Sequence, residues 1–147
     1  MLVVVTLLSL LAGISYPSFS ATIDSLRINT AADDIAALWN ASLNRAERRQ
    51  QPVEFAVSQN QNTIMAISAD GSFRRSVQMP SGVRVAGVLP RLPMDDQYPR
   101  RFLLNPGGSV PRVGIILANT RGVRRLVGVD PVSGVPRIQR LNPGDQP

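Results

Sequence analysis

The stretch MLVVVTLLSLLAGISYPSFS, residues 1–20, decides the fold, and it continues without a break into ATIDSLRINTAADDIAALWNASLNRAERR, residues 21–49. No charged residue occurs before Asp24, whereas the following part is polar and keeps apolar side chains at helical spacing. The pattern predicts one long helix in two halves. We expect residues 1–23 to lie in a bilayer, because a helix of that length spans roughly 35 Å, enough for a hydrocarbon core.

Two other interpretations compete with a membrane span. A secretory signal peptide has a similar apolar core, and Ser18-Phe19-Ser20 before Ala21 could serve as its cleavage site. Such a peptide begins with a basic region, however, and nothing basic precedes Arg27. The second alternative is a buried core helix. A continuous apolar run that is uncharged on every side favours the membrane over a protein core.

Residues 24–51 are predicted as an amphipathic half of the same helix. Small alanines separate its larger apolar residues, which recur every three or four positions: Ile23, Leu26, Ile35, Leu38 and Trp39. This narrow apolar stripe should pack on a sheet. Arg45, Arg48 and Arg49 fall in the last turn, where cations complement the carbonyl end of a helix, and Gln50-Gln51-Pro52 ends it.

Residues 52–141 predict an antiparallel β domain. Short runs of strand-forming residues alternate with turns that contain Gly, Pro, Asn or Asp, which is typical of a meander. We expect strands over residues 53–58, 63–68, 73–79, 83–89, 101–105, 113–119, 123–129 and 135–141. Residues 90–100 form a Pro-rich connection, and residues 142–147 a flexible tail. The fold class is therefore α+β, a long N-terminal helix packed on an antiparallel sheet.

The composition removes most catalytic chemistry. The 147 residues include no Cys and no His, and all sixteen basic residues are Arg, which leaves a net charge of +6. Thiol, disulfide, imidazole and Schiff-base chemistry are thus excluded. Asp95-Asp96 lies in the Pro-rich connection, where calcium ligation is weighed against a solvated loop and the loop is favoured. We predict that the protein is not an enzyme and needs no cofactor or metal.

The apolar run LVVVTLLSLLAGISYPS resembles the N-terminal helix of type IV pilins and type II secretion pseudopilins, in which a proline follows at the spacing of Pro17. Pro17 is expected to kink the helix, because it removes one backbone hydrogen bond. In that family a Gly-Phe-Thr-Leu-Ile-Glu motif precedes the run, and this chain lacks it. Cleavage and methylation by prepilin peptidase would need that motif, so a misplaced gene start or a fragment is expected.

The C-terminal half carries a second resemblance. The run FLLNPGG at residues 102–108, the apolar GIIL at 114–117, VGVD at 127–130 and SGVPRI at 133–138 are similar to the GspH/FimT group of minor pseudopilins and minor pilins. That group has an aromatic–apolar strand ending in Pro-x-Gly, an apolar strand and a closing hairpin.

Together the resemblances imply a minor pseudopilin of a type II secretion system, a structural subunit at or near the pseudopilus tip. It would be a single-pass inner-membrane protein with its globular domain in the periplasm, before it joins the filament. Its partners would be other major and minor (pseudo)pilins, bound through the N-terminal helix, and the assembly platform. The alternative is a FimT-like minor pilin of a type IV pilus. An unrelated membrane-anchored or secreted β domain is also open, and would lack a helix over residues 20–49 packed on the sheet.

A basic cluster is the candidate ligand site. FimT-type minor pilins implicated in DNA uptake are expected to bind DNA through a basic C-terminal surface, and the corresponding arginines here are Arg121, Arg124, Arg125, Arg137 and Arg140, with Arg112 near. Adjacent strand residues point to opposite sides, so only some of them share a face. No aromatic residue interleaves with them, which argues against base stacking. Solvated strand arginines are favoured, and salt-sensitive binding to DNA phosphates is the alternative.

Overall fold

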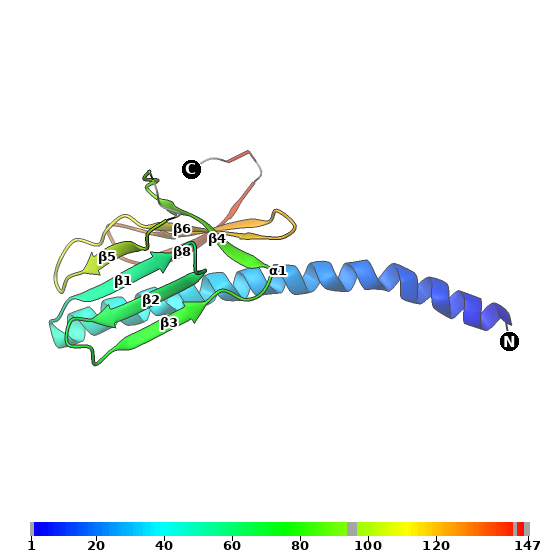
Figure 1. Cartoon of the computed structure of the whole chain (residues 1–147), viewed down its shortest axis with the longest axis horizontal. Helices are drawn as coiled ribbons and strands as arrows, with labels where there is room; N and C mark the ends of the chain where they lie inside the picture. The colour runs from blue at the N-terminus through cyan, green and yellow to red at the C-terminus, as the bar shows by residue number, and fades with distance from the viewer. Residues whose placement is uncertain (1, 94–96, 143, 146–147) are drawn as a thin grey trace.

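A computed structural model describes residues 2–93, 97–142, 144 and 145, without the side chains of residues 14–19. Its first element is the helix α1, Leu2–Arg49, which has 48 residues and is therefore about 72 Å long. Figure 1 shows the C-terminal half of α1 under the β domain, with the N-terminal half projecting far beyond it. The predicted long helix is confirmed, and it ends at Arg49 as expected.

The described residues of the globular head form two four-stranded antiparallel sheets. The first has the order β3-β2-β1-β5 and the second the order β4-β6-β7-β8. The strands of the first sheet are β1 (Val53–Ser58), β2 (Thr63–Ser68), β3 (Arg74–Gln78) and β5 (Arg100–Leu104). Those of the second are β4 (Val83–Leu89), β6 (Gly114–Asn119), β7 (Arg124–Val129) and β8 (Pro136–Leu141).

The predicted strand positions agree with these bounds to within one residue at each end, and the α+β fold class is confirmed. The single sheet expected from a meander is wrong. After β3 the chain crosses to the edge of the second sheet as β4, and it then returns as β5 to pair with β1. The pairing places Phe102 opposite Phe55 and Leu104 opposite Val53, which puts both β5 residues on the buried side. Local alternation fixes which side of a strand is apolar but not which strand lies beside it.

The core lies between α1 and the two sheets. Trp39 is almost fully buried, and its ring meets the edge of Phe55 with centroids 5.0 Å apart. The helix side of the core consists of Ile28, Ala31, Ala32, Ile35, Leu38, Trp39 and Ala46. The alanines let the helix approach the strands closely, as the sequence predicts. Because α1 packs on both sheets through this stretch, the alternative of an unrelated β domain without a packed helix is wrong.

Two members of the predicted stripe do not pack. Ile23 and Leu26 are 45% and 64% exposed, and Ile28 is the first fully buried residue of the helix. The head reaches this part of α1, since Arg121 contacts Asp24 and Ser20, but Ile23 and Leu26 lie outside the face of the helix that the head covers. Their exposure lengthens the apolar part of the helix that no other described segment of the chain covers.

The first half of α1 bears on two further predictions. Within the described residues, no helix contains an apolar stretch that meets the length and hydropathy needed to cross a membrane. The span predicted for residues 1–23 therefore has no support in the structure. The helix continues through Pro17. The kink there stays a prediction, because the side chain of Pro17 lies outside the described residues.

Candidate functional site

The exposed half of α1 is apolar on all sides. Each Leu and Val between residues 2 and 11 is more than half exposed, including the adjacent pairs Leu7-Leu8 and Leu10-Leu11. The hydroxyls in this stretch turn back to the helix, since Thr6 Oγ1 donates to the Leu2 carbonyl at 2.7 Å and Ser9 Oγ to the Val5 carbonyl at 2.8 Å. The surface thus offers apolar side chains with its hydroxyl donors already used. Such a surface is suited to packing against other apolar helices.

Arg121 joins the head to the start of the polar half of α1. Its Nε donates to Asp24 Oδ2 at 2.8 Å, and a second guanidinium nitrogen donates to Ser20 Oγ at 2.6 Å. The turn between β6 and β7 directs it there, because Asn119 Oδ1 accepts from the backbone N–H groups of Arg121 and Val123 at 3.0 and 2.9 Å. Arg121, which the sequence offers as a DNA-binding residue, therefore binds the carboxylate of Asp24 in the same chain.

Arg125 also faces α1. Its Nε donates to Asn29 Oδ1 at 2.9 Å. It shares the helix-facing side of the second sheet with Leu117 and Val127, which are both buried in the core. Arg140 lies opposite Arg125 on the edge strand β8, so it belongs to the same side.

Arg124 and Arg137 lie on the outer side of the second sheet. Arg137 sits opposite Gly128 on β8, and a guanidinium nitrogen lies 3.8 Å from Asp130 Oδ2. Hydrogen bonds from the Val132 N–H and then the Ser133 hydroxyl lower the pKa of Asp130, so that carboxylate is already occupied. The structure therefore divides the predicted cluster: Arg121, Arg125 and Arg140 lie on the helix side, and Arg124 and Arg137 on the outer side.

The register adds a cation that sequence reasoning did not include. Ala118 on β6 lies between Arg84 on β4 and Arg124 on β7, so the two arginines flank one small residue on the outer side. Strand alternation alone predicts which side of its strand Arg84 or Arg124 occupies. Only the strand order β4-β6-β7 could bring these two together.

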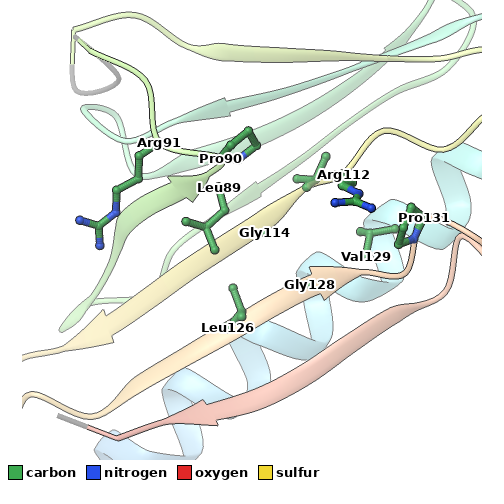
Figure 2. A pocket seen from close by; sticks show the side chains of 10 residues that line it. Leu89, Pro90, Arg91, Arg112, Gly114, Leu126, Gly128, Val129 and Pro131 are labelled. Atoms are coloured by element: carbon green, nitrogen blue, oxygen red, sulfur yellow. The ribbon is translucent and has the colours of Figure 1, made fainter. Parts of the chain in front are cut away.

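An apolar groove opens farther along the same outer side, as Figure 2 shows. Leu89 and Leu126 form its walls, Gly114 and Gly128 its floor, and Arg91 and Arg112 stand at its rim. A Cβ at Gly114 would lie 3.1 Å from Leu89 and 3.2 Å from Leu126, so the glycine lets the two leucines close over the strand. Nothing in the described part of the chain covers the groove.

A second basic site was not predicted. From the sequence, Arg45, Arg48 and Arg49 are expected only as cations at the end of a helix. In the structure, Arg75 on β3 joins them around a second groove, which encloses about 380 Å³. The signal in the sequence was the repetition of arginine, with the pair Arg74-Arg75 directly after the turn that ends at Phe73.

The chemistry that these sites offer is association. Among the described residues, no three acidic side chains come together as a metal site, and Asp95 and Asp96 lie outside those residues. The side-chain polar groups that line the apolar groove are guanidinium groups, which stay protonated and therefore cannot act as general bases.

Comparison with known proteins identifies the fold. No known family model matches the sequence, and no curated protein matches it. Among solved structures, the chain is similar to the minor pseudopilin EpsH from the type 2 secretion system of Vibrio cholerae. The TM-score is 0.57 at 11% sequence identity, over 80% of this chain and 98% of that chain. The protein therefore has a pseudopilin-like fold.

Proposed function

We propose that this chain is a structural, non-enzymatic subunit of a pseudopilus, a GspH-like minor pseudopilin of a type II secretion system at or near the filament tip. One observation carries the proposal: the half of α1 that projects from a pseudopilin-like head is apolar on every side and more than half exposed. An apolar surface of this extent is costly in water and marks an interaction site. No described part of the chain covers it.

In the proposed filament, the apolar halves of neighbouring subunits pack together at the centre and the heads face outward. Exchanging lipid for protein around side chains such as Leu8 gains little hydrophobic energy, so shape and close packing decide the association. Ala12 and Gly13 leave room for close helix contacts. The hydrogen bonds from Arg121 to Asp24 and Ser20 hold the head to the point from which this helix projects.

Before assembly, the same segment would anchor the chain in the bacterial inner membrane, with the head in the periplasm. Its partners would be other major and minor (pseudo)pilins and the assembly platform. Fractionation of expressing cells tests the anchor: the full chain is expected in the membrane fraction and should resist extraction by high salt. Recovery in the soluble periplasmic fraction would overturn the anchoring step.

Replacing Leu8 by Arg in the full chain tests assembly. A buried cation at the filament centre should abolish cross-linking and co-purification with the other subunits of the same system. Leu103→Arg is the matched control, because Leu103 is similarly exposed but lies on the head, at 55% compared with 61% for Leu8. The proposal fails if the Leu8→Arg protein folds and associates as well as the unaltered chain.

The alternative is a FimT-like minor pilin of a type IV pilus that binds DNA through C-terminal arginines. The observation that favours it is the outer side of the second sheet, where Arg84 and Arg124 flank Ala118. Arg137 lies on the same side, opposite Gly128, which is four residues farther along β7 than Arg124. Replacing Arg124 and Arg137 by Ala should then abolish retardation of DNA. Replacing Arg121 and Arg125, which face α1, should leave most of it. Absence of retardation of DNA by the unaltered protein at low salt would contradict this alternative.

A further inference from the structure

The basic groove lies where the last turn of α1 meets the beginning of β3, at the end of the head away from the projecting helix (Figure 1). We define the arginine groove by Arg45, Arg48 and Arg49 from α1 and Arg75 from β3. Ala41, Asn44 and Phe73 complete its lining. Four arginines from two separate elements thus line one hollow.

Two of these arginines are held in place before any ligand arrives. The guanidinium carbons of Arg45 and Arg75 lie 5.9 and 5.6 Å from the centre of the Phe73 ring, within the range of cation–π contacts. Arg45 also donates to the hydroxyl of Ser72, which in turn donates to Asp70 Oδ2 at 2.7 Å. This ordering reduces the entropy that a bound anion would otherwise cost.

The charge of the arginine groove is compensated only in part, by Asp70, which lies near Arg45 and is linked to it through the Ser72 hydroxyl. Within the described residues, none of its four arginines has a carboxylate at ion-pair distance, whereas Arg121, Arg101 and Arg137 each have one. The Nε atom of Arg45 is buried and has no hydrogen-bond partner. An unsatisfied buried donor is costly, so this side chain is held in the groove at some expense in stability. The C-terminal carbonyls of α1 offset only about half a unit charge.

The shape of the site favours an extended peptide. A second hollow continues along α1, formed by Ala37 and Leu38 against β3, and Arg75 borders both hollows. From Ala37 to Arg49 the helix rises about 18 Å, which matches five or six residues of extended chain. The floor is apolar, and Asp34 stands at the far end. A matching segment therefore has apolar residues over Ala37 and Leu38 and its carboxylates beside the arginines.

Nucleic acid fits this site less well. Proteins that bind single-stranded nucleic acid rely on aromatic rings on which bases stack. Here the guanidinium groups of Arg45 and Arg75 already lie against the ring of Phe73, where a base would have to stack. The apolar side chains of Ala37 and Leu38 offer a phosphate backbone neither a charge nor a hydrogen-bond donor. Carboxylates of a peptide suit the planar fork of arginine equally well and can be joined to apolar side chains.

We propose that the arginine groove binds an extended acidic and partly apolar segment of a neighbouring filament subunit. The identity of the partner as a filament subunit rests on the proposed function, while the chemistry of the segment rests on the groove alone. Together with helix packing at the filament centre, this contact would join the heads of adjacent subunits at its surface.

Peptide binding by the full chain in detergent tests the inference. The probe is a fluorescein-labelled hexapeptide, Leu-Ala-Leu-Glu-Glu-Glu, and the readout is fluorescence anisotropy. Replacing Arg45 and Arg75 together by Gln should weaken binding at least about tenfold, because each removes a charge-assisted hydrogen bond. Arg48→Gln, at an exposed position where folding is not at risk, should weaken it about threefold. Added salt should reduce binding by the unaltered chain.

Arg74→Gln is the matched control. It removes the same charge one residue away, but strand alternation places Arg74 on the other side of the first sheet, so binding should change less than about twofold. A peptide with Gln in place of Glu should not bind. The proposal is overturned if the acidic peptide does not bind at low salt, if Arg74→Gln weakens binding as much as the double change, or if a six-nucleotide single strand binds more tightly through Arg45 and Arg75.

The outcomes separate this inference from the proposed function. The Leu8→Arg chain should keep peptide binding although it fails to assemble. A chain that assembles but binds no acidic peptide would remove the groove proposal and leave the proposed function standing.

Discussion

The side chain of Arg121 donates to the carboxylate of Asp24 at 2.8 Å, across a separation of 97 residues in sequence. The contact lies between the buried part of α1, which begins at Ile28, and the exposed apolar part that precedes it. It therefore ties the β6–β7 turn of the head to the place where the helix leaves the head. Ser20 takes a second hydrogen bond from the same guanidinium.

A double-mutant cycle measures the interaction energy between Arg121 and Asp24. Arg121→Gln and Asp24→Asn are expected to show a coupling of about 0.5–1 kcal/mol in the free energy of unfolding, because the pair is only partly exposed and well oriented. The coupling should fall as salt is added. Arg101 and Glu54 form the control pair, which is longer at 3.6 Å and more exposed, and should couple by less than about 0.3 kcal/mol. Equal coupling energies in both pairs would contradict a stabilising role for the contact between Arg121 and Asp24.

Trp39→Phe should destabilise the head. The indole Nε1 donates to the Gly134 carbonyl at 3.0 Å in a buried position, so phenylalanine leaves that carbonyl without its donor and a space where the larger ring stood. We expect a loss of about 2–3 kcal/mol in the free energy of unfolding, measured by denaturant titration. Tyr98→Phe, which alters an aromatic residue that is 70% exposed, should change the stability by less than about 0.5 kcal/mol.

Gly114→Ala should disturb the apolar groove. The added methyl would lie 3.1 Å from Leu89 and 3.2 Å from Leu126, closer than ordinary contacts, so one leucine must shift. We expect a loss of about 1–2 kcal/mol in stability, read from thermal or denaturant unfolding. Gly87→Ala in the same sheet is the control, since its methyl would meet only Ile116 at 3.8 Å. If the Gly114→Ala chain is as stable as the control, the prediction is wrong, and Leu89 and Leu126 can move aside without a loss of stability.

Acid stability should depend on Asp70. Hydrogen bonds from Ser68 first, and then from Ser72, lower the pKa of Asp70 from 3.8 to about 2. A lowered folded pKa means that the carboxylate contributes its stabilisation above about pH 4 and loses it as the pH falls towards 2. Unfolding followed by circular dichroism should show this loss for the unaltered chain and a smaller one for Asp70→Asn. Ser72→Ala should move the loss to higher pH, whereas Ser76→Ala, at an exposed position of β3, should not move it.

Much of the architecture followed from local sequence. The uncharged run before Asp24 and the apolar spacing after it predicted the helix, because both reflect a single element. The strands were located nearly to the residue, because alternation and turn residues are also local. What alternation could not supply was the partner of each strand, and so β4 and β5 were not expected to exchange sheets. The exposure of Ile23 and Leu26 was missed for the same reason, since it depends on which face of α1 the head covers.

The candidate sites divide in the same way. The apolar half of α1 was evident from the sequence alone, because its character does not depend on any other segment. The arginines could be counted but not grouped. Only the folded chain turns Arg121 and Arg125 towards α1, sets Arg84 beside Arg124, and brings Arg45 and Arg75 to one phenylalanine ring. The sequence determined which elements form and which faces are apolar. The tertiary structure decided which charges meet, because those meetings join residues up to about a hundred positions apart and depend on strand order and helix docking.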